Sequence, residues 1–105
     1  GSDRALVYRR IRARMEDELA THPANPSASY WLAAAARAQG DQQGAWDAVQ
    51  AAWARAPLAA DRGAVLRADL DRLMTRGIIP ERAKAVSQPP AALVAEWERF
   101  KERWK

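Results

Sequence analysis

The chain has 105 residues, with 17 Lys and Arg against 13 Asp and Glu, so its net charge is +4. This length corresponds to one domain, and the absence of cysteine excludes disulfides, thiolate chemistry and cysteine-based metal sites. With 49% hydrophobic and 29% charged residues the composition is not that of a disordered chain, and no stretch approaches the roughly 20 apolar residues of a membrane span. Alanine occurs 25 times and β-branched residues are scarce, which predicts an all-α domain.

Two features bear on the origin of the chain. Gly1-Ser2 resembles the remnant of a cleaved expression tag, so we assign the domain to residues 3–105 and leave the native N-terminus open. The excess of alanine and of arginine over lysine indicates a GC-rich bacterial genome. Cytoplasmic and periplasmic locations both remain open, including the soluble part of a membrane-anchored protein.

The first predicted helix covers residues 3–21 and ends before Pro23, because proline disfavours helix in the residue that precedes it. Apolar residues recur every four positions along one stripe of this helix: Val7, Ile11, Met15 and Leu19.

The next two helices are bounded by local capping signals. Asn25 is a strong N-cap and Pro26 suits the first helical position, so the second helix begins there and ends at Gly40, which is expected in a left-handed conformation. Asp41 then caps a third helix, over residues 42–55, which ends before Pro57.

The second half of the chain predicts three more helices. Asp61 can cap a fourth, which Gly77 ends, and Pro80 begins a short fifth that ends at residue 86. Pro90 begins the last helix. Its apolar stripe is Leu93, Trp97, Phe100 and Trp104, and that of the fourth helix is Val65, Leu66, Leu70, Leu73 and Met74.

The chain carries an internal period. His22-Pro23 recurs 34 residues later as Ala56-Pro57, and a two-helix unit of 34 residues is the period of the tetratricopeptide repeat. Residues 25–57 resemble one such repeat through a large-then-small pair, an interhelical turn and small residues before the exit: Leu32-Ala33, Gly40-Asp41, Ala45, Ala52 and Pro57. Ser29 and Ala36 stand where the family has aromatics, and Arg67 where a small residue is usual.

The resemblance implies a tetratricopeptide-like stack of five to six antiparallel helices with a C-terminal capping helix. The residue pattern agrees with this arrangement, because the second and third helices have almost no polar face and therefore belong in the middle of a stack. The outer helices are amphipathic, as the ends of a stack are.

The sequence does not predict an enzyme, a metal site or a cofactor. His22 is the single histidine and fits the end of a helix, while the serines fit capping positions and loops. Asp61, Asp69 and Asp71 are expected to be solvated acids paired with arginines, since residues two apart on a helix diverge in direction.

The predicted function is a protein–protein interaction module. By resemblance, a concave groove would bind a peptide or partner helix. Its expected lining is Ser27, Tyr30, Ala34, Arg37 and Ala38. The ring of Tyr30 can stack on a ligand and its hydroxyl can donate a hydrogen bond, while Arg37 can pair with a carboxylate of the ligand. The last helix allows two interpretations for Trp97, Phe100 and Trp104: they cap the stack, or they form a second, exposed partner site.

Two other functions stay open. The chain can be a self-associating structural domain of a larger protein, forming a homo-oligomer. Alternatively the first helix, with Arg4, Arg9, Arg10, Arg12 and Arg14, can bind nucleic acid or an anionic membrane surface. Because these arginines are spread around the helix and acids follow them, a solvated face is the preferred interpretation.

Overall fold

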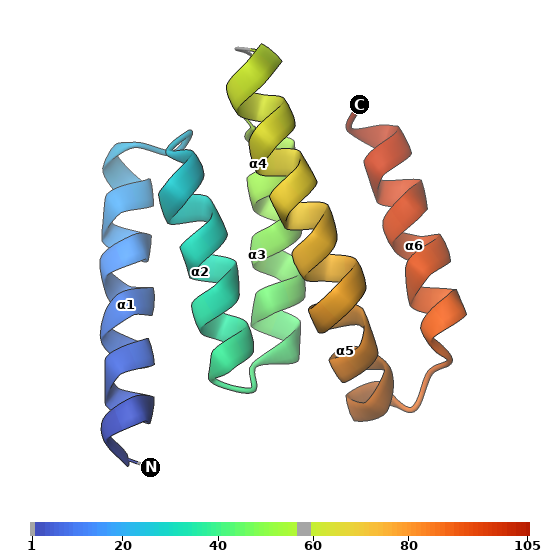
Figure 1. The fold of residues 1–105 in the computed structure, drawn as a ribbon, viewed down its shortest axis with the longest axis horizontal. Coiled ribbons are helices and arrows are strands. Elements are labelled where there is room, and N and C mark those ends of the chain that lie inside the picture. The colour runs from blue at the N-terminus through green and yellow to red at the C-terminus, as the bar shows by residue number, and fades with distance from the viewer. Residues whose placement is uncertain (1, 57–59) are drawn as a thin grey trace.

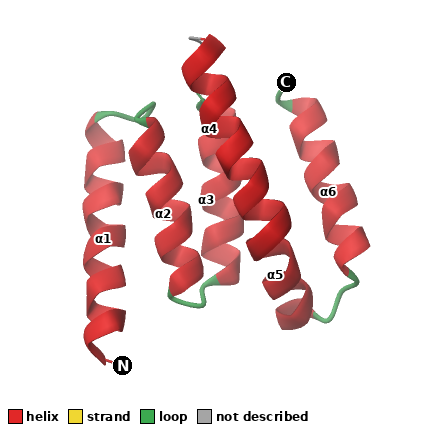
Figure 2. Cartoon of the chain, in the orientation of Figure 1, coloured by secondary structure: helices red, strands yellow, loops and turns green. Residues whose placement is uncertain are grey.

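The computed structural model describes the backbone of residues 2–56 and 60–105, and every element in those residues is helical (Figures 1 and 2), which confirms the all-α class. Gly1, the predicted helix exit at Pro57 and the capping side chain of Asp61 lie outside the described residues. In chain order the elements are α1 (Ser2–Thr21), α2 (Pro26–Ala38), α3 (Gln42–Ala54), α4 (Ala60–Leu73), the π-helical segment η1 (Met74–Ile78), α5 (Ile79–Val86) and α6 (Pro90–Arg103).

The helices form a flat array in which successive helices run in opposite directions, apart from the continuous run of α4, η1 and α5 (Figure 1). The helix α2 packs against α1, α3 and α4, and Figure 1 shows α4 lying in front of α3. The Cα atoms span 37 × 37 × 17 Å, so the array is about two helices thick.

Local capping chemistry sets both ends of α2 and the start of α3 as the sequence predicts. The side chain of Asn25 accepts a hydrogen bond from the N–H of Ala28 at 3.1 Å. The side chain of Asp41 accepts one from the N–H of Gly44 at 2.8 Å. Between the two helices Gly40 has a φ of +78°, the left-handed conformation in which glycine is least strained.

The prediction that Gly77 ends a helix is wrong, because α4, η1 and α5 follow one another without a break over residues 60–86. In η1 the N–H of Ile79 bonds to the carbonyl of Met74, five residues back. Pro80 has no N–H, and in an α-helix its ring would meet the carbonyl four residues earlier. The wider turn of η1 removes that conflict and lets the helix pass through the proline.

Gly77 instead allows a close approach between two helices. A Cβ at this position would lie 2.6 Å from Cζ and 2.7 Å from Nε of Arg37 on α2. The guanidinium of Arg37 therefore rests against the backbone of η1, in the space that a Cβ at position 77 would take.

The core lies between α2, α3, the rod of residues 60–86 and α6. Its largest fully buried side chains are Trp97, Leu70, Met74, Ile78, Ile79, Leu93 and Val49. Four alanines of α2 and α3 are buried with them, which lets the backbones of these helices come close: Ala33, Ala36, Ala45 and Ala52. Val65, predicted as part of the buried stripe of α4, is 64% exposed.

Trp97 belongs to this core and is not an exposed partner residue. Its ring is fully buried, and its Nε1–H donates to Oδ1 of Asp71 at 2.8 Å. The ring stacks on half-buried Phe100 at a centroid distance of 5.7 Å, while Trp104 is 44% exposed. The second, exposed site predicted on α6 is therefore wrong for Trp97.

The side chain of Arg67 connects two helix ends. Its Nη2 donates to the carbonyl of Trp53 at 3.0 Å and to that of Trp104 at 2.8 Å. Its guanidinium lies 4.6 Å from the ring centroid of Trp53. One long basic side chain thus joins the C-terminal ends of α3 and α6, which a small residue at this position could not do.

The helix α1 has α2 as its main neighbour and keeps much of its surface in solvent. Leu19 is buried at its C-terminal end, but Val7 is 51% exposed, so the predicted stripe is buried in part. A tie to the α2–α3 turn comes from Arg12, whose Nη1 donates to Asp41 at 2.8 Å and to Gln39 at 2.9 Å. The hydrogen bond that Arg12 donates to the Asp41 carboxylate raises the pKa of Arg12.

Candidate partner-binding face

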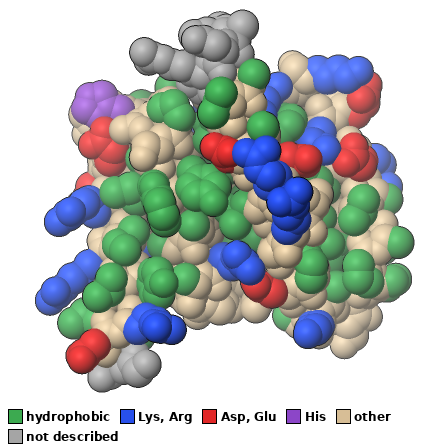
Figure 3. All heavy atoms as spheres, viewed as in Figure 1, with side chains coloured by type: hydrophobic (Ala, Val, Ile, Leu, Met, Phe, Trp, Pro, Cys, Tyr) green, Lys and Arg blue, Asp and Glu red, His purple; other side chains and the backbone are tan. Residues whose placement is uncertain are grey.

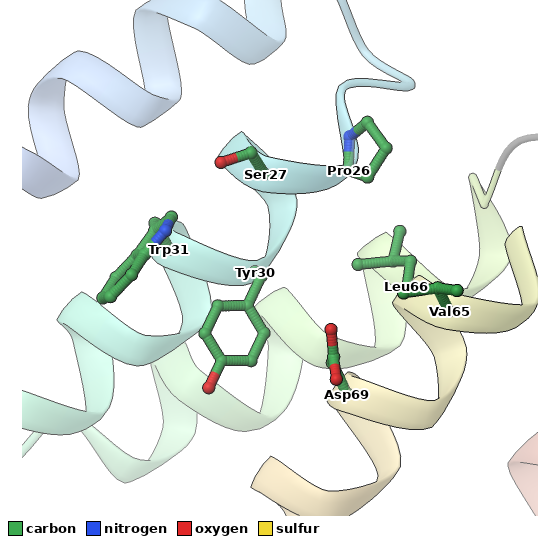
Figure 4. A pocket seen from close by; sticks show the side chains of 7 residues that line it. All are labelled: Pro26, Ser27, Tyr30, Trp31, Val65, Leu66 and Asp69. Carbon is green, nitrogen blue, oxygen red and sulfur yellow. The ribbon is translucent and has the colours of Figure 1, made fainter. Parts of the chain in front are cut away.

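A hollow of about 400 Å³ opens between the N-terminal half of α2 and the middle of α4 (Figure 4). The helix α2 contributes Tyr30, and α4 contributes Asp69 on the other side of the hollow. The remaining lining residues are mostly apolar: Pro26, Ser27, Trp31, Val65 and Leu66. The hollow is thus a mainly apolar cleft with one carboxylate at its edge.

Two consecutive aromatic residues divide the surface of α2. Because neighbouring helix positions point about 100° apart, Tyr30 faces α4 and packs against the core, while Trp31 is 52% exposed. Their rings meet edge to face, with centroids 5.5 Å apart and planes at 88°. Trp31 therefore stands as a ridge whose orientation is fixed by Tyr30.

The hollow continues across Trp31 toward α1. A second hollow, of about 170 Å³, lies between α1 and α2, and Trp31 lines it together with Tyr8, Ile11, Ala34, Ala35 and Ala38. A third, of about 220 Å³, lies on α1 and shares Ile11 with the second; its other lining residues are Val7, Arg10, Arg14 and Met15. We call the surface formed by these three hollows the front face.

The front face is the side of the molecule seen in Figure 3. Hydrophobic side chains gather there over α1 and α2 and reach the edge of α4, and basic side chains project along the α1 edge. Three large apolar residues that are at least half exposed lie on it: Val7, Trp31 and Val65. Contiguous apolar surface of this kind marks interaction sites in soluble proteins.

Charged side chains near this face are already engaged in two ion pairs. Asp69, which lines the first hollow, is bound by Arg72 one turn along α4. Arg37, near the C-terminal end of α2, donates from Nε to both oxygens of Glu81 at 2.9 and 3.2 Å. The hydrogen bond that Arg37 donates to the Glu81 carboxylate raises the pKa of Arg37. The cation that the sequence predicted for a ligand is therefore already held within the protein.

Four arginines of α1 differ from Arg37 in their charge environment. Arg10 and Arg14 line the third hollow, and Arg4 and Arg9 line a further one, of about 350 Å³, beside Tyr8 and Ala38. Among the residues whose side chains the structure describes, 3–56 and 63–105, none of these four makes an ion pair. Positive charge without a counter-ion thus borders the apolar surface on its α1 side.

The structure places four of the five predicted groove residues on the front face. Ser27 and Tyr30 line the first hollow, and Ala34 and Ala38 line the second. The sequence reasoning missed Trp31 and Val65. The spacing of Ser27, Trp31, Ala34 and Ala38, at intervals of four, three and four, puts Trp31 on the same helix face and could have revealed it.

The part of the chain that the structure describes contains no group of three or more His, Asp or Glu side chains arranged to hold a metal ion. Nor is any helix in that part long and apolar enough to cross a membrane. Comparison of the chain with known protein families, with curated proteins and with solved structures found no match.

Proposed function

We propose that this chain is a protein-interaction module that binds a peptide or a partner helix on the front face. The observation that carries the proposal is Trp31, a half-exposed tryptophan held in place between two apolar hollows. Tryptophan is enriched among the residues that dominate binding energy. Such residues cluster in well-packed pockets near the centre of an interface. The α2–α4 hollow, with its apolar walls and a few polar groups at the rim, has the composition of a recognition site.

Within this proposal the array is a tetratricopeptide-like stack. Two features support it: the 34-residue period of the sequence, and the packing of α2 against both its hairpin partner α3 and the next helix α4. The front face then corresponds to the ligand-binding side of such a stack. The capping role of α6 is supported by its buried Leu93 and Trp97 and by the charged residues on its other side.

The test starts from a random linear peptide library displayed on phage and selected against the intact chain. Peptides that bind are then titrated against Trp31→Ala and Val65→Asp variants. Because both positions are at least half exposed, the variants keep the fold, which circular dichroism checks. We expect each change to weaken binding about tenfold or more.

Val86 and Val94 supply the matched controls, since they are 44% and 39% exposed and do not line the front face. Val86→Asp and Val94→Asp should leave affinity unchanged. Peptides that bind the Val65→Asp variant as well as the native chain would contradict the proposal. So would a chain that sediments as a dimer dissociated by Val65→Asp, because the front face would then be a self-association surface.

A further inference from the structure

We infer that the segment recognised by the front face is an amphipathic α-helix that carries acidic residues along one flank and docks with that flank over α1. This inference rests on the proposed function and adds the conformation, the charge and the orientation of the partner. Three features of the described residues lead to it: the balance of charge at the rim, the lack of free backbone groups, and the width of the face.

The charge balance at the rim favours an acidic partner. Among the side chains that the structure describes, Asp69 is the one carboxylate lining the three hollows, and Arg72 already neutralises it. On the opposite side Arg10 and Arg14 line the third hollow without an ion pair among the described residues. Complementary charge across an interface guides encounter and fixes orientation, so the acidic groups of the partner belong over α1.

The front face favours a helix over an extended peptide. An extended peptide that adds to the edge of a sheet gains affinity through its backbone hydrogen bonds. Here the floor of the face consists of α1, α2 and α4, whose backbone groups are bonded within the helices. A peptide laid over Trp31 and Ala34 in extended form would leave its own polar backbone unpaired on apolar surface. A helix satisfies its backbone groups internally and presents side chains alone.

The dimensions of the face fit one helix. Packed helices lie about 8–10 Å apart, so α1 and α4, which flank α2, leave a strip about as wide as one helix with its side chains. Trp31 lies along this strip, with one hollow on each side. Apolar residues one turn apart on the partner can enter both hollows, while acidic residues on the α1 flank reach Arg10 and Arg14.

The experiment uses a yeast-displayed library of helical peptides of about 18 residues, or five turns. Leucine is fixed along one face, and each flanking position varies among Glu, Gln and Lys. Selection against the intact chain should enrich Glu on one flank and show no such preference on the other. The enriched peptides should bind more weakly in about 0.5 M salt, where charges at the rim are screened.

A double variant locates the acidic flank. Arg10→Gln with Arg14→Gln should weaken the enriched peptides about three- to tenfold, the size expected for two exposed charge pairs. The matched control is Arg99→Gln with Arg103→Gln on α6, which removes the same charge from exposed positions away from the front face and should change nothing.

Three results would overturn the inference while leaving the proposed function intact. Binders from the random library that depend on Val65, together with no binders from the helical library, would exclude a helical partner. Enriched helices without a Glu preference would exclude the charge assignment. An unchanged affinity in the Arg10→Gln, Arg14→Gln variant would exclude docking of the acidic flank over α1.

Discussion

Two tryptophans show how neighbours decide the role of a residue. Trp97 is surrounded on all sides: Trp53 meets it edge to face at 5.2 Å, Phe100 stacks on it, and Asp71 accepts its indole hydrogen. Trp31 has Tyr30 on one side and solvent on the other. The same side chain therefore holds the core together in α6 and offers binding surface in α2.

This contrast predicts that replacing the two tryptophans lowers stability by different amounts. Trp97→Ala leaves a large cavity and should lower the free energy of unfolding by about 3–5 kcal/mol. Trp31→Ala removes a half-exposed ring and should cost no more than about 1 kcal/mol. Urea denaturation of both variants measures the two losses in the free energy of unfolding. Equal losses would show that the burial of Trp97 or of Trp31 is misassigned.

Arg37 and Gly77 depend on each other. A methyl group at position 77 must displace the guanidinium of Arg37, and with it the ion pair to Glu81. The same methyl group favours the helix by up to about 1 kcal/mol, because alanine is the better helix former. The two effects oppose each other as long as Arg37 is present.

Gly77→Ala should therefore change stability little in the native chain and stabilise the Arg37→Ala variant by up to about 1 kcal/mol. A double-mutant cycle, measured by chemical denaturation, gives the coupling between the two positions. If the effects of the two substitutions on the free energy of unfolding simply add, Gly77 and the side chain of Arg37 are not coupled.

At the scale of elements, the sequence predicts what local chemistry determines. Asn25, Gly40 and Asp41 act on backbone groups within a few residues, so both ends of α2 and the start of α3 can be predicted from the local sequence. The role of Gly77 cannot be predicted in this way, because the side chain that packs against it, Arg37, lies 40 positions earlier in the chain. Arg37 and Glu81 are 44 positions apart.

The same limit applies to the candidate site. Periodicity shows that Val65 belongs to an apolar set on α4, but it does not show that no helix covers that side. The lining of the α2–α4 hollow depends on how two helices meet, and this depends on contacts throughout the core. Sequence spacing therefore predicts part of the α2 lining of the front face and misses Val65 on α4.

Asp41 links two elements and makes their packing sensitive to pH. The N–H of Gly44 and the guanidinium of Arg12 bond to its carboxylate and hold its pKa below the ordinary value of 3.8. A carboxyl whose pKa is lower in the folded state stabilises the fold at pH values above the unfolded pKa. This contribution is lost as the pH falls through the folded pKa.

Asp41→Asn should consequently be less stable than the native chain at neutral pH, and this difference should shrink as the pH falls through the folded pKa of Asp41. Asparagine is also a good N-cap, so the substitution keeps the bond to Gly44 and removes the charge that faces Arg12. Urea midpoints across the pH range test this. If the difference in urea midpoint between the two proteins does not vary with pH, the ion pair between Asp41 and Arg12 does not contribute to stability.

At the scale of the whole molecule, stability is unevenly distributed. The helices α2 and α3 lie between other helices, whereas α1 has one main neighbour and a tie at Arg12. Such an edge element can open locally without unfolding the rest. The front face, which includes α1, is therefore built partly on the element with the fewest constraints.

Native-state hydrogen exchange should reveal this gradient. We expect amides of α1 to exchange with a lower opening free energy than those of α3, which exchange by global unfolding. Arg12→Ala should accelerate exchange in α1 and leave α3 unchanged. Equal protection of the two helices would show that α1 unfolds together with the core.

The π-helical turn before Pro80 has a consequence for how this chain tolerates changes in length. A turn closed by i to i+5 bonds holds one residue more than an α-turn, so η1 amounts to one residue inserted into an otherwise regular rod. Losing one residue elsewhere in the rod would rotate everything after it by about 100°. Losing Thr75, with Pro80 replaced by alanine so that the narrower turn can form, should keep α5 and α6 in their present orientation. This shortened chain should show the circular dichroism and cooperative melting of the parent, whereas loss of Ala68 from α4 should abolish both.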